Sequence, residues 1–302
     1  MPEYSERFFR SGTLRIHFRD WGDPSAPPLI LVHGLRDHSH SFDDLARGLL
    51  DRHHVIALDL RGHGDSETTP YYSFGHFVLD LHNLIRALRL QKPVIIGHSL
   101  GGEVVAHYGG SFPDVANRLV IIEGLGPPPL DLDEEVRWTI DGFARIDRAL
   151  AGHPGLKDLD AAYRRLRERN PRLSETKARE LALLGTRARE DGTLEWKFDS
   201  MLTTMALNGP FHLDYSMAMW QRIAAPTLII HGGESGEFWR SKAGAVYLEP
   251  DDLSHRLACF RSHRFVELAG AGHMVHFDRP RELVTAIREF LHDAPTKPPG
   301  SR

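Results

Sequence analysis

Cysteine is almost absent from this chain, which has one cysteine, Cys259, among its 302 residues. A lone cysteine excludes an internal disulfide, which fits a reducing compartment. The first residues, MPEYSERFFRSG, lack the apolar core of a secretory signal. No apolar run approaches the ~20 residues needed to cross a bilayer. These absences predict a soluble, cytoplasmic protein without a membrane span.

An excess of one charge is also missing. The chain has 37 Lys and Arg residues against 41 Asp and Glu residues, so its formal net charge is −4 at pH 7. Such a balance creates no overall field that would attract nucleic acid or an anionic membrane. We therefore expect a small-molecule substrate and no nucleic-acid partner. Composition does not indicate the oligomeric state.

The motifs that commonly hold cofactors and metals are absent too. The sequence has no G-x-G-x-x-G and no Walker phosphate loop. Its 19 histidines are scattered. His33, His38 and His40 lie close together, but no second ligand set follows them at a spacing typical of zinc sites. We expect neither a cofactor nor a metal.

What the sequence does contain is an alternation of short apolar runs and longer amphipathic stretches. Continuous apolar runs are typical of strands that are covered on both faces of a parallel sheet. The stretch from Phe74 to Leu88 has the spacing of one helix face. This alternation predicts an α/β fold, with residues 6–10 and 13–20 as an antiparallel entry to the sheet. The apolar runs are PPLILVHG (27–34), HHVIALDLRG (53–62), KPVIIGHS (92–99) and RLVIIEG (118–124).

The strand pattern stops at residue 125 and resumes at 225–233 and 263–270. The intervening stretch is rich in Arg and Leu and reads as several helices with nearly balanced charge. We interpret it as an inserted cap. The predicted domains are a core of residues 1–124 and 223–292, a helical cap of residues 125–222, and a flexible tail of residues 293–302.

The first chemical motif is Gly97-His98-Ser99-Leu100-Gly101, a G-x-S-x-G between a predicted strand and a predicted helix. A serine in such a tight turn needs small neighbours two residues away on either side. The turn exposes the Ser99 hydroxyl and points the Leu100 N–H into the site at the start of a helix. This setting predicts Ser99 as a nucleophile.

Two further stretches fit the same chemistry. His33-Gly34 directly follows a buried strand, so the next N–H, that of Leu35, can face the same developing oxyanion. His273 lies in a Gly-flanked loop after a late strand and is the strongest candidate for the general base. Neither the His33-Gly34 turn nor His273 is a specific motif by itself. Their positions along the chain relative to Ser99 strengthen both assignments.

Together these motifs resemble the α/β-hydrolase fold superfamily, over residues 6–124 and 223–292. The resemblance implies an eight-stranded, mostly parallel sheet with helices on both faces and a variable cap. It also implies a Ser–acid–His triad in that chain order, without a metal. DLRGHGDS (59–66) resembles a loop of the superfamily that we interpret as architecture near the pocket.

The acid of the triad is not where the resemblance places it. The usual position follows the strand at 226–231 and is usually Asp, whereas this turn contains Glu234, Ser235 and Glu237. Glu123 lies at the end of the preceding apolar strand, where a buried carboxylate is costly unless it is paired. Some haloalkane dehalogenases of this superfamily use a Glu at the matching strand end. We favour Glu123 and keep Glu234 as the alternative.

A serine nucleophile favours acyl chemistry. We predict a serine hydrolase that cleaves a small, fairly apolar carboxylic ester, thioester or lactone through an acyl-enzyme on Ser99. The alternatives are a C–C bond hydrolase of the same fold and a ligand-binding receptor without catalysis. The candidate pocket residues are His33, Gly34, His98, Trp138, Trp196 and Trp220.

Overall fold

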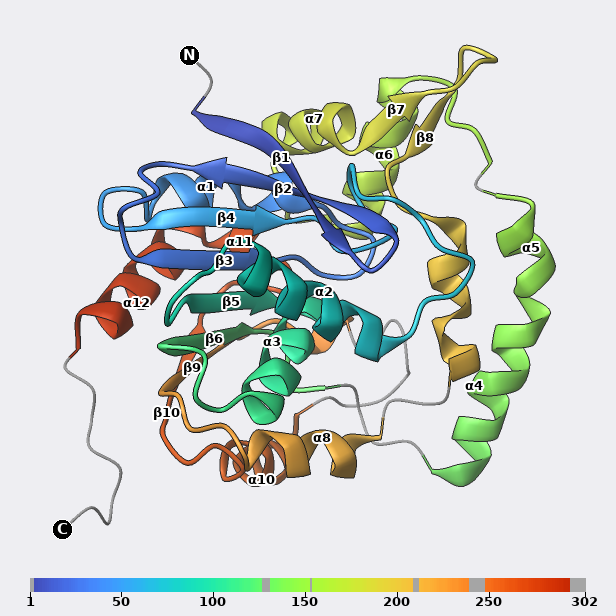
Figure 1. Ribbon diagram of the computed structural model, residues 1–302. Helices are drawn as coiled ribbons and strands as arrows, with labels where there is room; N and C mark the ends of the chain where they lie inside the picture. The colour runs from blue at the N-terminus through green and yellow to red at the C-terminus, as the bar shows by residue number, and fades with distance from the viewer. Residues whose placement is uncertain (1–2, 127–130, 153, 209–211, 239–247, 294–302) are drawn as a thin grey trace, which may run out of the picture.

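The structure is a computed structural model that describes residues 3–126, 131–152, 154–208, 212–238 and 248–293 (Figure 1). Its centre is an eight-stranded sheet. In spatial order the strands are β1 (Tyr4–Ser11), β2 (Leu14–Trp21), β4 (His54–Leu58), β3 (Pro28–Val32), β5 (Val94–His98), β6 (Arg118–Ile122), β9 (Thr227–Gly232) and β10 (His263–Leu268).

The sheet is parallel from β4 through to β10. Only β2 runs in the opposite direction, against both β1 and β4. Every residue of β4, β5 and β6 is buried, which is why these strands read as continuous apolar runs. The predicted mostly parallel sheet with an antiparallel entry is confirmed.

Side chains of the central strands alternate between two hydrophobic cores. Ile95 and Ile121 face one core, and Ile96 and Ile122 face the other. Figure 1 shows helices on both faces of the sheet. The first core is covered by α2 (Phe74–Ala87), α3 (Leu100–Ser111), α8 (Leu213–Trp220) and α10 (Pro250–Leu257). The second is covered by α1 (Asp43–Arg47), α11 (Val275–Asp278) and α12 (Pro280–His292).

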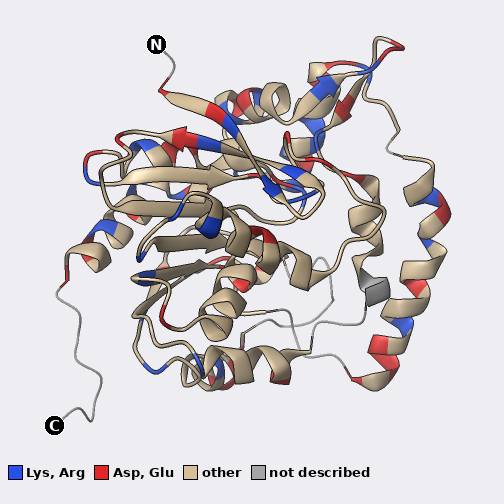
Figure 2. Cartoon of the chain, in the orientation of Figure 1, with Lys and Arg blue, Asp and Glu red and all other residues tan. Residues whose placement is uncertain are grey.

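Most of the chain between β6 and β9 lies outside this sheet, beyond the carboxyl ends of the strands (Figure 1). Charges of both signs are mixed along α4 and around α6 and α7 (Figure 2). The segment comprises α4 (Leu132–Ala144), α5 (Ile146–Leu150), α6 (Leu159–Arg169), α7 (Glu175–Leu184), β7 (Thr186–Ala188), β8 (Leu194–Trp196) and the 3-10 helix η2 (Ser200–Asn208).

The antiparallel hairpin of β7 and β8 was not expected. Each strand has only three residues, too few to show a periodic pattern. Its turn closes through an N–H···O bond from Gly192 to Arg189, with Gly192 at φ +81°. That left-handed conformation favours glycine.

Helix α8 belongs with the core, although we expected residues up to 222 to be cap. Trp220 is fully buried and stacks on Phe260 at 5.3 Å between ring centroids. Ser216 Oγ lies 2.9 Å from Nε2 of His107, which is on α3. The division into core and cap remains our proposal, with its second boundary moved to the residues before α8.

The predicted tail of residues 293–302 falls almost entirely outside the described residues, which end at Asp293. Within the described ranges, the structure has no helix that combines the length and the apolar character needed to cross a membrane.

Candidate active site

Ser99 occupies the turn between β5 and α3 with φ +53° and ψ −119°. Its N–H donates to the Ile122 carbonyl at 2.9 Å, and its carbonyl accepts the N–H of Glu103 at 3.1 Å. A Cβ on Gly97 would lie 2.2 Å from the Gly101 carbonyl oxygen, and one on Gly101 would lie 2.1 Å from that of Val32. Both glycines of the motif are therefore sterically required.

Two backbone segments meet at Ser99. Leu100 is the first residue of α3, so its N–H has no acceptor within the helix and lies at the positive end of the helix dipole. Gly34 lies against the nucleophile, since a Cβ added there would be 3.2 Å from the Ser99 Cβ. Leu35 follows directly and is 43% exposed. This arrangement supports the Leu35 and Leu100 N–H groups as oxyanion donors, which remains a prediction.

Two buried histidines contact the turn at Gly34, and His33 Nδ1 lies 2.7 Å from the Gly34 carbonyl oxygen. His33 Nε2 accepts the N–H of Leu60 at 3.1 Å. His63 Nε2 accepts the N–H of Arg36 at 3.0 Å. Burial lowers the pKa of His63 to about 3, so its ring is neutral and can accept. His33 is completely buried, so our placement of this residue on the pocket wall was wrong, because its ring supports the turn.

His273 connects Ser99 to Glu123. Its Nε2 lies 3.0 Å from Ser99 Oγ, and its Nδ1 lies 3.0 Å from Glu123 Oε2. The ring is only slightly exposed and lies parallel to the ring of Phe238, at 4.0 Å between centroids and 10° between planes. Sequence analysis did not single out Phe238, because one aromatic residue in the short helical segment after β9 forms no pattern.

Glu123 is the first residue after β6 and has φ +55°. Its own N–H donates to the Ile230 carbonyl, and its Oε1 accepts the N–H of Gly232 at 2.7 Å. Strands β6 and β9 are hydrogen-bonded neighbours with Ile122 opposite Ile230. The end of β6 therefore places the Glu123 carboxylate beside the end of β9.

Burial dominates the electrostatics of Glu123 and raises its pKa to about 7. His231, the Ser235 hydroxyl and the Gly232 N–H oppose this effect and lower the pKa. Ser235 occupies the turn where the resemblance places the acid, and it is fully buried. Among the described residues, its hydroxyl forms no hydrogen bond that meets the distance and angle limits. In this turn a hydroxyl therefore stands beside the Glu123 carboxylate.

The other two carboxylates of this turn are exposed. Glu237 forms a bidentate ion pair with Arg172, whose two terminal nitrogens donate to the carboxylate oxygens at 2.6 and 3.0 Å. Within the described residues, no hydrogen bond or ion pair joins Glu234 to His273. The structure therefore brings Ser99, His273 and Glu123 together and leaves Glu234 outside.

The remaining pocket candidates differ in position. His98 is buried beneath Ser99, with Nε2 donating to the His273 carbonyl at 2.8 Å. Trp196 is partly buried and stacks on Phe198. Trp138 on α4 is 47% exposed. Trp220 is wrong as a pocket residue, because it packs in the core with Phe260.

Two surface hollows, of about 340 and 390 Å³, lie at the opposite end of the sheet. They are lined by residues that precede β3, β5, β6 and β9 and by the first residues of β3 and β4. Ligands of open α/β sheets bind at the carboxyl ends of the strands. We therefore assign neither hollow to the chemistry at Ser99.

Comparison with known proteins identifies the family of this fold. A family model described as the alpha/beta hydrolase fold matches residues 27–280. The chain belongs to the α/β-hydrolase fold family. This α/β hydrolase is 30% identical over 272 residues to "Esterase YbfF" of Escherichia coli (strain K12), covering 88% of this chain and 93% of that protein.

Other relatives of this α/β hydrolase fit the same picture. It is 27% identical over 277 residues to "sn-1-specific diacylglycerol lipase ABHD11" of Mus musculus, covering 89% of this chain and 82% of that protein. The solved structure "Thioesterase Domain From Curacin Biosynthetic Pathway" has a TM-score of 0.80 and 25% identity, covering 94% of this chain and 99% of that one. These similarities support a serine hydrolase of this fold.

Proposed function

We propose that this α/β hydrolase is a serine esterase that cleaves small, fairly apolar carboxylic esters, thioesters or lactones through an acyl-enzyme on Ser99. The observation that carries the proposal is the continuous chain of contacts from Ser99 Oγ through His273 to Glu123, with both distances at 3.0 Å. The similarity to proteins named esterase, lipase and thioesterase supports the same class.

The proposed reaction begins when Ser99 Oγ attacks the substrate carbonyl and its proton passes to His273 Nε2. The Nδ1–H of His273 donates to Glu123, whose negative charge stabilises the imidazolium. The N–H groups of Leu35 and Leu100 stabilise the oxyanion. His273 then gives its proton to the leaving alcohol or thiol, which departs and leaves the acyl-enzyme.

The second half of the reaction uses the same groups. His273 Nε2 removes a proton from water, whose oxygen attacks the acyl carbonyl. The Ser99 Oγ–acyl bond breaks, and the proton returns to Ser99. The products are a carboxylic acid and free enzyme.

The C–C hydrolase alternative shares these steps, so substrate preference alone separates it from an esterase. The alternative of a binding protein without catalysis depended on the missing aspartate after β9. Glu123 supplies a carboxylate to His273, which removes the observation that favoured it.

Labelling and a substrate panel test the proposal together. A fluorophosphonate probe should label the protein at Ser99, and a series of p-nitrophenyl esters of increasing acyl length should show turnover. A thioester, a lactone and a C–C substrate complete the panel. Absence of both labelling and turnover in the folded protein would contradict the proposal, and turnover of the C–C substrate alone would favour that alternative.

The raised pKa of Glu123 predicts how activity depends on pH. Only the ionised carboxylate can stabilise protonated His273, so kcat/KM should fall as the pH drops through about 7. The apparent pKa of this profile belongs to the Glu123–His273 pair. A pH series of kcat/KM with one ester of the panel measures it. A profile that stays flat from about pH 5 to pH 8 would contradict the proposed role of Glu123.

The same carboxyl should affect stability in the opposite direction. A carboxyl with a raised pKa stabilises the folded state while it is protonated, and this contribution is lost as the pH rises. For Glu123 it is fully present below the usual value of 4.5 and is lost as the pH rises through about 7. Relative to Glu123→Gln, the wild type should therefore lose up to about 3 kcal/mol of unfolding free energy across this range. Urea unfolding of both proteins at the two ends of the range measures the difference.

A further inference from the structure

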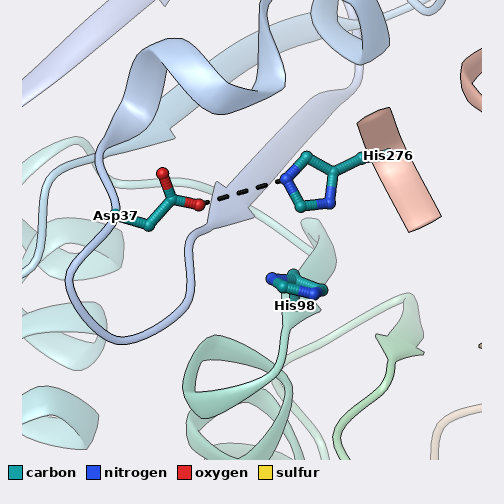
Figure 3. Close-up of side chains that lie close together, drawn as sticks. All are labelled: Asp37, His98 and His276. Carbon is teal, nitrogen blue, oxygen red and sulfur yellow. Dashed lines mark ion pairs between the residues drawn. The ribbon is translucent and has the colours of Figure 1, made fainter. Parts of the chain in front are cut away.

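A second cluster of side chains, two buried histidines and one half-buried aspartate, lies beside the Ser99–His273–Glu123 site. It consists of Asp37, His98 and His276 (Figure 3). Each residue offers one ligand atom, and these atoms all lie within 4.8 Å of one another. Asp37 Oδ2 is 4.0 Å from His276 Nε2, and the two imidazole rings are 4.5 Å apart between centroids. The three side chains come from the turn after β3, the end of β5 and α11.

The cluster has an unusual number of polar atoms without partners. Among the described residues, Asp37 Oδ2, His98 Nδ1 and both ring nitrogens of His276 have no hydrogen-bond partner. The His98 side chain is 1% exposed and that of His276 is 3% exposed. Buried polar groups in proteins are almost always satisfied. One ion held by all three side chains would give partners to Asp37 Oδ2, His98 Nδ1 and one ring nitrogen of His276.

The protonation states suit a cation. Burial lowers the pKa of His98 to about 3 and that of His276 well below its usual value, so both rings are neutral with free lone pairs. His98 donates through Nε2 to the His273 carbonyl, which leaves the lone pair on Nδ1. Burial raises the pKa of the Asp37 carboxyl, and a bound cation would hold this group ionised. The positive charge of Lys177, which also lowers the pKa of His276, is paired with Asp44 and Glu180.

We propose that Asp37, His98 and His276 bind one divalent transition-metal ion of the Zn²⁺ type, and that the bound ion inhibits hydrolysis at Ser99. Two imidazoles and one carboxylate are ligands that Zn²⁺ accepts, whereas Mg²⁺ and Ca²⁺ prefer oxygen ligands. Ligand atoms at ~2.1 Å from one ion lie roughly 3–4 Å apart. The 4.0 Å between Asp37 and His276 is already at the edge of that range.

Local spacing did not predict this site, because the ligands come from three distant segments. Those segments also carry the proposed catalytic groups. Asp37 lies two residues after Leu35, His98 directly precedes Ser99, and His276 lies three residues after His273. An ion that draws the three ligands together would move these groups from positions that catalysis requires to within about 0.5 Å. Inhibition follows from this coupling, and this part of the proposal rests on the proposed function.

The test uses the full chain after treatment with EDTA and removal of the chelator. Calorimetric titration should show one Zn²⁺ bound per chain, and bound Co²⁺ should give the visible absorption of a site with nitrogen ligands. Saturating Zn²⁺ should reduce ester hydrolysis by at least about 10-fold by displacing the catalytic groups. EDTA should restore the activity, and Mg²⁺ should not reduce it.

Two variants locate the ion. Asp37→Asn keeps the size and one oxygen acceptor but removes the charge, and His276→Gln removes the imidazole. Each should weaken Zn²⁺ binding by at least about 10-fold and abolish the Co²⁺ absorption. Both should remain active without metal. His255→Gln, which removes an exposed histidine of α10, is the matched control and should bind as the wild type does.

The outcomes separate this proposal from the proposed function. Undiminished Zn²⁺ binding in both variants, or no binding by the wild type, would overturn the site. Binding that the variants lose, without any change in wild-type activity, would overturn the inhibitory effect. If the protein hydrolysed no ester at all, the proposed function would fail, and the calorimetric and Co²⁺ measurements would still decide the metal site.

Discussion

Replacing Ser99 with alanine should reduce ester hydrolysis at least ~10⁴-fold, to near the uncatalysed rate. The substitution removes the oxygen that attacks the substrate carbonyl in the first step of the proposed mechanism. Alanine differs from serine by one hydroxyl and tolerates the φ of +53° no worse than serine does. The fold should therefore remain, so that loss of activity reports the chemistry.

Turnover of the p-nitrophenyl ester series and labelling by a fluorophosphonate measure the effect. Circular dichroism and thermal unfolding check the fold. Ser111→Ala, at the last residue of α3, is the matched control because it removes a hydroxyl from the exposed end of the same helix. It should keep wild-type activity. Ordinary hydrolysis by a folded Ser99→Ala protein would mean that another group is the nucleophile.

Replacing Glu123 with glutamine should reduce kcat by roughly 10⁴-fold while leaving the fold intact. The amide oxygen can still accept the N–H of Gly232, which Glu123 Oε1 accepts at 2.7 Å. The amide NH₂ then faces Nδ1 of His273 and favours the tautomer with its proton on Nε2. That tautomer cannot accept the Ser99 proton. The negative charge that stabilises the imidazolium is lost as well.

Glu234→Gln is the control for this prediction. Glu234 is exposed, and no described contact joins it to His273. Its replacement should change kcat/KM by no more than about twofold, as expected for a surface carboxylate away from the chemistry. Steady-state kinetics of both variants with the same ester make the comparison. A large loss in Glu234→Gln together with a small one in Glu123→Gln would return the acid to the turn after β9.

Local patterns in the sequence are sufficient to predict the central strands and the nucleophile turn. The strands β4, β5 and β6 are buried on both faces, so their residues are apolar except at one end of each strand, where His54, His98 and Arg118 lie. The glycines around Ser99 had to be glycine, because any side chain would meet a backbone carbonyl. Constraints of this kind act between residues a few positions apart, so they produce patterns that can be recognised in the sequence.

The spatial order of the strands was not readable in the same way, and it decides what surrounds Ser99. The sheet places β6 beside β9, so Glu123 meets Gly232 and His273 across more than 100 residues of chain. The same packing buries Trp220 against Phe260 instead of in a pocket.

The sequence by itself thus determined the fold class, the nucleophile turn and the candidate acids. Only the tertiary structure placed Glu123, and not Glu234, against His273, packed α8 on the core, and brought Asp37 to His98 and His276. The physical reason is the distance along the chain over which each constraint acts. Steric limits on a turn and apolar burial along a strand act on neighbours in sequence, whereas contacts between strand ends depend on a sheet order that does not follow the order of the chain.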